Sequence, residues 1–295
     1  MSRFTTGLYA LALALALCLS SPAIGAQKQP EPLRIIALAP HLVEMLYDIG
    51  LGDNIVATLE HADYPGAATS IPVVGSYAQL NIEAIIALQA DIIIAWKSGN
   101  PDADIQRLRQ LGQTVVYSNP QTIDDIARET EAFAVRFGKA GIGQGKAQEF
   151  RASIKKLRHK YQHKAPVRVF YQIWSQPLTT VAGKAWSQQQ LELCAAVNPF
   201  SRHSRDYPQV NIEDVLLADP QLLIIPTGTD NGESTAINWQ RYPQLSAIKH
   251  NQIVQPNADI LHRMTLRLPA ELGRLCQQIE QSRQYYQQID NGMSH

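Results

Sequence analysis

The sequence predicts an α/β protein of two Rossmann-like lobes, each with a central, mainly parallel sheet, joined by a helical connector. Residues 77–83, with the sequence YAQLNIE, recur almost unchanged as YPQVNIE at residues 207–213. The offset of 207 − 77 = 130 residues is longer than a solenoid period and favours two similar lobes. On both sides of a helical middle segment, apolar strand-like runs alternate with helix-like segments, which is typical of parallel sheets covered by helices.

The first 26 residues are typical of a secretory signal peptide. Arg3 gives a positive start, residues 8–19 are almost entirely Leu and Ala, and a small-residue site ends at Ala26. The apolar run is too short for a membrane span, and Leu17 stands before Cys18 where a lipoprotein would need a small residue. We therefore expect cleavage near Ala26 and a periplasmic protein. Removing Arg3 leaves 26 − 1 = 25 basic against 26 acidic side chains, a balance that does not favour nucleic acid.

Three segments follow the signal peptide (residues 1–26). The N-terminal α/β lobe is expected at residues 27–121, the helical connector at 122–165 and the C-terminal α/β lobe at 166–295. A helical connector would hold the lobes at a nearly fixed separation, unlike a Gly/Ser hinge. In the first lobe we expect strands at 33–38, 54–59, 71–74, 91–96 and 114–117, and helices at 41–49, 82–88 and 102–111.

The connector is expected to be helical from Thr122 to about His163, with a joint at the glycine cluster 138–145. That cluster is not a phosphate loop, because it follows no buried strand and Ala147 stands where the motif requires Ser or Thr. In the second lobe we expect strands at 167–173, 222–226 and 253–255, and helices at 187–197, 212–217 and 268–281.

The exported chain keeps two cysteines, Cys194 and Cys276. An even pair in an oxidising compartment is most simply a disulfide. It would tie the helix at 187–197 to the last helix and close a loop for which chain entropy suggests about 4 kcal/mol of stabilisation. The alternative is a catalytic cysteine, but neither residue has a nearby partner signature.

The repeat supplies the candidate binding residues. Tyr77 and Tyr207 each stand four residues before a predicted helix N-cap, at the edge where open α/β sheets bind ligands. Each tyrosine could instead pack on its own lobe, but a matched pair favours ligand contact. Trp96, at the end of a buried strand, could serve as a ligand platform or as a lid on the core.

The repeat also contains a matched pair of glutamates, Glu83 and Glu213. Each lies in the first turn after its predicted N-cap, where the helix dipole favours a carboxylate. We expect the two carboxylates to be exposed at corresponding positions of the two lobes.

Motifs of the common hydrolases are absent from the sequence, which contains neither Gly-x-Ser-x-Gly nor His-Glu-x-x-His. His159 and His163 are four residues apart and could share a metal ion, but the lysines and arginines around them favour a solvated helix face. We therefore predict a binding protein, not an enzyme, with no catalytic residue and no metal site.

The chain resembles the periplasmic binding proteins that use one long connecting helix and serve ABC importers of metal chelates, in particular those that carry cobalamin (vitamin B12). The resemblance rests on segments spread over almost the whole mature chain: 34–40 (RIIALAP), 63–65 (DYP), 81–96, 183–184 (GK), 191–194 (LELC), 207–210 (YPQV) and 275–276 (LC). It implies a monomer that binds cobalamin as cargo, has no cofactor of its own, and docks on the membrane subunits of an importer.

The resemblance also implies roles for individual residues. Glu83 and Glu213 would dock arginine pockets of the importer, and Cys194 would pair with Cys276. The implied ligand contacts are His61, Tyr77, Trp96, Tyr207, Asp259, Ile260, Leu261, His262 and Arg263. A haem or ferric-siderophore receptor of the same fold, with Tyr77 or His61 as an iron ligand, is the alternative, and an exported enzyme using the same cleft is a weaker one.

Overall fold

The computed structural model describes residues 32–228 and 237–292. The predicted signal peptide, residues 1–26, lies outside the described residues. From Leu33 onward the chain forms one compact unit. Within the described residues, no helix combines the length and the apolar character needed to cross a membrane.

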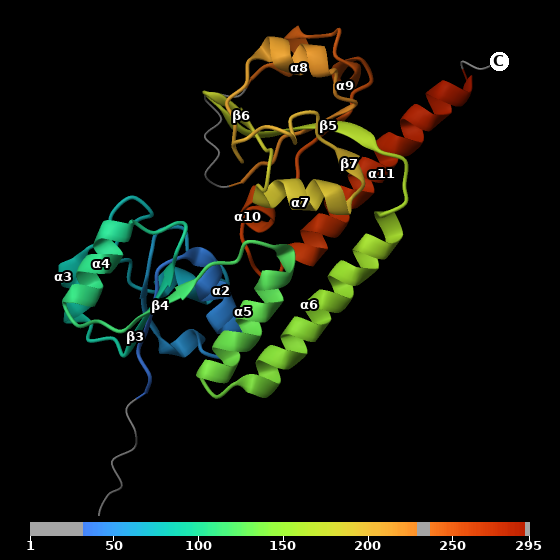
Figure 1. Ribbon diagram of the computed structural model, residues 1–295. Helices are drawn as coiled ribbons and strands as arrows, with labels where there is room; N and C mark the ends of the chain where they lie inside the picture. The colour runs from blue at the N-terminus through green and yellow to red at the C-terminus, as the bar shows by residue number, and fades with distance from the viewer. Residues whose placement is uncertain (1–31, 229–236, 293–295) are drawn as a thin grey trace, which may run out of the picture. The chain divides into compact units, whose positions relative to one another are not determined.

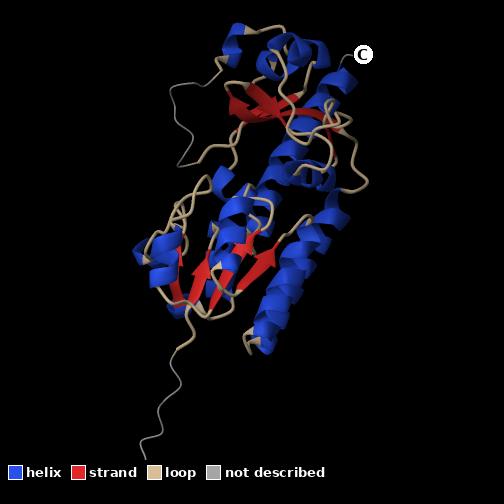
Figure 2. Ribbon diagram, turned by 60° about the vertical axis from the view of Figure 1, so that its left-hand side comes forward, coloured by secondary structure: helices blue, strands red, loops and turns tan. Residues whose placement is uncertain are grey.

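The first lobe is built on a parallel sheet in the order β2-β1-β3-β4. Figure 2 shows its strands as red arrows that lie side by side. Alternate residues of β1 and β3 enter two separate apolar clusters, so the sheet is buried on both faces, as the apolar runs predicted. The strands are β1 (Ile35–Ala37), β2 (Ile55–Thr58), β3 (Ile92–Trp96) and β4 (Val115–Ser118), and the helices are α2 (Pro40–Asp48), α3 (Ile82–Ala87) and α4 (Asp102–Gln110).

The prediction of a strand at 71–74 is wrong. Val73 makes a single isolated bridge with Thr58, and the chain then turns at Gly75, whose φ of 141° suits glycine alone. Short 3₁₀ turns at Gly52–Asn54 and Gly66–Ser70 complete this lobe.

The connector consists of two helices, α5 (Ile123–Arg136) and α6 (Ala140–Tyr161), which pack side by side (Figure 1). The predicted joint at 138–145 is too long, because α6 already begins at Ala140 and includes three of the glycines. One of them is required by packing: a Cβ on Gly143 would lie 2.2 Å from the Cβ of Ala134. Gly143 therefore permits close contact between α5 and α6, and Gly138, with φ of 70°, serves the turn.

The second lobe has a mixed sheet in the order β6-β5-β8-β9, with β7 also paired to β5. Only β6 runs antiparallel among these described pairings, so the prediction of a mainly parallel sheet is confirmed. The strands are β5 (Val167–Ser175), β6 (Leu178–Thr180), β7 (Ala196–Val197), β8 (Leu222–Ile224) and β9 (Ile253–Val254); the helices are α7 (Trp186–Leu193), α8 (Ile212–Ala218), α9 (Ser246–Lys249), α10 (Ala258–Leu261) and α11 (Leu268–Gly292), with a 3₁₀ turn at Trp239–Arg241.

The helix predicted at 187–197 ends four residues early. Ala195 adopts a left-handed backbone with φ of 54°, which reverses the chain and lets Ala196 and Val197 pair with β5 as β7. The apolar character of these residues fits a buried helix and a buried strand equally well, so the pattern alone could not separate them.

The predicted disulfide is present. Cys194 at the end of α7 is bonded to Cys276 in α11, across 82 residues of sequence, and both side chains are fully buried. Beside this bond, the guanidinium of Arg283 donates to the carbonyl oxygens of Cys194 and Ala195 at 3.0 and 3.2 Å. The bond and these contacts fasten α7, which supplies part of the site described next, to α11.

Candidate functional site

A cavity of about 470 Å³ is lined by residues from both lobes and from the segment that joins them. Its wall combines three tryptophans and a tyrosine with several polar groups, the composition expected of a site for a large, mostly apolar ligand. The lining residues are Trp96, Ser98, Pro120, Gln121, Ile173, Trp174, Lys184, Ala185, Trp186, Ser187, Asp206, Tyr207, His262 and Met264.

Trp96 is the aromatic contribution of the first lobe, at the end of β3. Its backbone N–H donates to Oδ1 of Asn100 at 2.7 Å, and Nδ2 of Asn100 donates to the carbonyl of Leu38 at 2.7 Å. Gly99 leaves room for the indole, since a Cβ there would lie 1.8 Å from its ring. Behind the indole stands His41, edge-on with ring centroids 5.2 Å apart. The polar loop after β3 therefore holds Trp96 in place.

Tyr207 and Trp186 form the facing aromatic surface of the second lobe. Burial raises the pKa of Tyr207, while a hydrogen bond with the Trp186 backbone acts in the opposite direction. Nε1 of Trp186 donates to the carbonyl of Leu261 at 2.7 Å. The two rings are thus anchored by polar contacts at their edges, which leaves apolar ring surface available in the cavity wall.

Two residues with charged side chains, Lys184 and Asp206, line the cavity next to this surface. The backbone N–H of Lys184 donates to Oδ1 of Asp206 at 2.7 Å. Gly183, with φ of 51°, makes that approach possible because a Cβ there would lie 2.6 Å from the same carboxylate oxygen. A carboxylate and an ammonium group in the lining of one cavity can bind amide or carboxyl substituents of a ligand.

His262 is the imidazole of the cavity wall. Its Nε2 lies 3.0 Å from the hydroxyl of buried Tyr171. Desolvation lowers the pKa of His262 to about 4, with Asp259 acting in the opposite direction, so the ring is neutral at pH 7. A neutral imidazole has one donor and one acceptor nitrogen, and Tyr171 engages the Nε2 side.

The sequence-predicted residues divide into two groups. Of the residues predicted to contact the ligand, Trp96, Tyr207 and His262 line the cavity. Tyr77 is 75% exposed and Leu261 is fully buried in the core, and His61 occupies an exposed left-handed turn with φ of 66°. These three, with Asp259, Ile260 and Arg263, lie outside the lining of this cavity.

Arg263 binds the opposite lobe. Its guanidinium donates to Oδ1 of Asp63 at 2.5 Å and to the carbonyl of His61 at 3.1 Å, and lies 3.4 Å from Oε1 of Glu44. Arg267 also binds Glu44, through two bonds of 2.7 and 2.5 Å. Glu44 is only 2% exposed. The two arginines therefore clamp the segment before α11 to α2 and to the loop after β2.

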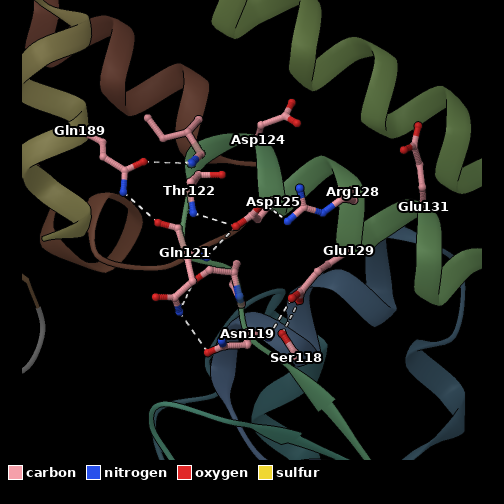
Figure 3. A network of polar contacts seen from close by, with 12 residues as sticks. Ser118, Asn119, Gln121, Thr122, Asp124, Asp125, Arg128, Glu129, Glu131 and Gln189 are labelled. Carbon is pink, nitrogen blue, oxygen red and sulfur yellow. Dashed lines mark hydrogen bonds and ion pairs between the residues drawn. The ribbon is translucent and has the colours of Figure 1, made fainter. Parts of the chain in front are cut away.

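Residues 118–123, which link β4 to α5, are held by contacts with both α5 and α7 (Figure 3). Glu129 of α5 accepts from the backbone of Asn119 at 2.7 Å and from the hydroxyl of Ser118. Nε2 of Gln189, in α7, donates to the carbonyl of Gln121 at 2.8 Å. Since Gln121 lines the cavity, these bonds fix one part of its wall.

Sequence reasoning missed several of these residues. Trp174 and Trp186 were assigned no role, although the Ser-Gln-Pro-Leu-Thr-Thr run after Trp174 is a turn signal followed by strand formers and could have indicated a hairpin. The clamp on Glu44 joins residues more than 200 positions apart, and no local pattern marks such a pair.

The burial of His41 predicts a pH dependence. Desolvation lowers the pKa of His41 to about 4 from 6.5, so between these values the unfolded chain binds a proton that the folded chain does not. Stability should therefore fall as the pH decreases below 6.5, by up to about 1.4 kcal/mol per pH unit. Asp48, whose pKa burial raises to about 6 from 3.8, has the opposite effect between those values.

The variant His41→Phe separates the contribution of His41 to this pH dependence from that of Asp48, because Asp48 is present in both the variant and the wild-type protein. We expect the variant to lose about 2 kcal/mol less stability than the wild-type protein between about pH 7 and about pH 5, measured by urea unfolding. Equal losses in the two proteins would show that His41 becomes protonated in the folded chain as readily as in the unfolded one.

The two glutamates predicted to dock on the importer lie on separate lobes. Glu83 is in the first turn of α3 and Glu213 in the first turn of α8, and both are exposed. Their helices begin alike, with Asn81 accepting from the N–H of Ala84 at 3.0 Å and Asn211 from the N–H of Asp214 at 2.7 Å. The predicted N-caps are confirmed, and the repeat marks matching helix starts in the two lobes.

Two α/β lobes, a helical connector and an aromatic cavity lined from both lobes define the class of two-lobe solute-binding proteins. The chain belongs to the periplasmic binding protein family, whose profile matches residues 35–259. It is 38% identical to a vitamin B12-binding protein of Vibrio cholerae serotype O1, over 82% of this chain and 87% of that protein. It is 34% identical to one of Pectobacterium atrosepticum, over 90% and 92% of the two chains.

Solved structures agree in fold. The crystal structure of the periplasmic vitamin B12 binding protein of Vibrio cholerae matches with a TM-score of 0.77 and 37% identity, over 84% of this chain and 97% of that one. The periplasmic haem-binding protein of Roseiflexus sp. RS-1 matches with a TM-score of 0.74 at 18% identity, over 85% and 99%. At that identity the second likeness concerns the fold alone.

Proposed function

We propose that this protein is a periplasmic receptor that captures cobalamin in the cavity between its lobes and delivers it to an ABC importer. The observation that carries the proposal is the cavity lined by Trp96 from one lobe and by Trp186 and Tyr207 from the other. The named function of relatives at 34–38% identity supports cobalamin as the ligand. The protein would act after removal of the predicted signal peptide, as a monomer without a cofactor.

The chemistry of the wall suits this ligand. Aromatic faces bind an extended ring through apolar contact, while Lys184, Asp206 and the neutral His262 offer polar partners to amide groups at its periphery. Titration calorimetry of the mature protein with cyanocobalamin tests the proposal, and we expect one ligand per chain. Absence of binding at micromolar concentrations would contradict it.

A haem or ferric-siderophore receptor is the second candidate. Its support is the position of His262 and Tyr207 in the cavity wall, since imidazole and phenolate groups both bind iron. Neither Tyr77 nor His61, which the sequence suggested as iron ligands, lines the cavity. An exported enzyme remains the weakest candidate. Among the described residues, no group of three His, Cys, Asp or Glu side chains is arranged to hold a metal ion.

The docking role of the two exposed glutamates gives a separate prediction. Glu83→Ala combined with Glu213→Ala should leave cobalamin affinity unchanged within about twofold, because neither residue lines the cavity, and should weaken binding to the importer at least tenfold. Surface plasmon resonance on the importer in detergent measures the second quantity. Asp102→Ala with Asp124→Ala, which also removes two exposed helix-start carboxylates, is the control. Equal importer affinity in both double variants would contradict the assignment.

A further inference from the structure

A small cavity lies where α2, α5 and the segment before α11 meet. Its volume is about 10 Å³, which is close to the space that one water molecule requires. Helix α2 contributes His41 to its lining, α5 contributes Glu129 and Thr130, and the segment before α11 contributes Thr265. Three parts of the chain that are distant in sequence therefore place polar side chains around one small space.

His41 and Thr265 each bring a buried polar atom to this lining. Nε2 of His41 and Oγ1 of Thr265 have no hydrogen-bond partner among the described residues, and the two residues are only 7% and 3% exposed. A buried donor or acceptor that stays unsatisfied costs folding free energy, so such atoms are nearly always paired with a protein group or with an ordered water. Two such atoms at one cavity indicate a shared partner inside it.

The segments that carry these two side chains are fastened to each other by ion pairs. Glu44, three residues after His41 in α2, binds Arg263 and Arg267, which stand two residues before and two residues after Thr265. The small cavity therefore lies between two segments whose spacing is fixed by direct contacts.

A third polar group of the lining is the carboxylate of Glu129. It accepts from the backbone N–H of Asn119 at 2.7 Å and from the hydroxyl of Ser118 (Figure 3), and each of its oxygens has a lone pair left for a further bond. A water molecule donates two hydrogen bonds and accepts two, and buried waters make about three. Water can therefore serve His41 in either neutral tautomer, the hydroxyl of Thr265, and this carboxylate.

We propose that one buried water molecule occupies the small cavity and bridges Nε2 of His41 to Oγ1 of Thr265, with Glu129 as a further acceptor. Neither a hydrated ion nor an organic molecule fits a space of about 10 Å³. The bridge joins α2 of the first lobe to the segment that leads into α11. Because His41 packs edge-on against Trp96, with ring centroids 5.2 Å apart, the water also restrains the residue that supports this indole.

A high-resolution crystal structure of the mature chain tests the site directly. We expect density for one ordered water within about 2.7–3.2 Å of both Nε2 of His41 and Oγ1 of Thr265. Thr265→Val, which replaces the hydroxyl with a methyl group of similar size, should lose the bond to this position, whereas Thr265→Ser should keep it. An empty cavity in the wild-type map, or a water bonded to only one of the two groups, would overturn the proposal.

Urea unfolding measures the contribution of the water to stability. At about pH 8, where His41 is neutral in the folded and the unfolded chain, Thr265→Val should lower the unfolding midpoint by at least about 0.3 M, because the water loses one of its partners. A dry cavity predicts the opposite sign, since the substitution would then remove an unsatisfied buried hydroxyl. His41→Phe combined with Thr265→Val should lower the midpoint by less than the sum of the single changes, because both disrupt the same water. An unchanged or raised midpoint in Thr265→Val, or additive effects, would contradict the bridge.

Discussion

Glu44→Ala should destabilise the protein by about 3–5 kcal/mol, the cost of removing one partner of a buried ion pair. Glu44 is 2% exposed, and the side chains of Arg263 and Arg267 that it binds are 13% and 23% exposed. Without the carboxylate, two guanidinium groups remain in a poorly hydrated position. Arg267 keeps the ring of Tyr64, 3.7 Å from its guanidinium carbon, and Arg263 keeps Asp63, which limits the loss.

A matched control exists in the connector. Glu131 in α5 binds Arg151 of α6 through two bonds of 2.7 and 2.8 Å, but these side chains are 31% and 37% exposed. Glu131→Ala should therefore cost only about 0–1 kcal/mol. Urea unfolding of both variants measures the difference, and equal losses would show that the clamp between Glu44 and the two arginines contributes no more than a surface pair.

Removal of the disulfide should cost about 4 kcal/mol. Cys194 and Cys276 are 82 residues apart in sequence, and the entropy of closing such a loop in the unfolded chain gives this magnitude. Neither cysteine lines the cavity, so Cys194→Ala combined with Cys276→Ala should keep its cobalamin affinity within about threefold while its unfolding midpoint falls.

Reduction of the wild-type protein provides the comparison. Treated with dithiothreitol, it should unfold at the same urea concentration as the double variant, and the variant itself should not respond to the reductant. A double variant as stable as the oxidised wild-type protein would mean that Arg283, which binds the carbonyls of Cys194 and Ala195, already holds α7 to α11 without the bond.

Most of the fold could be predicted from local sequence patterns. Buried strands such as β3 and helix starts such as Asn81 and Asn211 carry strong signals, because apolar runs and N-caps act within a few residues. The repeat went further, since it related the two lobes and pointed to Tyr207. Each of these features depends on residues that lie close together in the sequence.

The site was harder to predict from the sequence, because its residues are brought together by contacts between distant parts of the chain. Trp174 reaches the cavity through a hairpin register that depends on Gln209, 35 positions away. Arg263 was predicted to contact the ligand; its carboxylate partners Glu44 and Asp63, 219 and 200 positions distant, could not be predicted from the local sequence. A sequence pattern indicates that such side chains are polar or aromatic, and the tertiary fold decides which of them meet.

The most direct test of the central claim is the absorption spectrum of the purified protein after incubation with cyanocobalamin, haemin and a ferric siderophore in turn, each followed by desalting. A receptor for cobalamin should keep about one equivalent of the corrin absorption and lose the bands of the other two compounds. Retention of haemin or the ferric siderophore with loss of the corrin bands would contradict the claim and assign this protein to another ligand of the same fold.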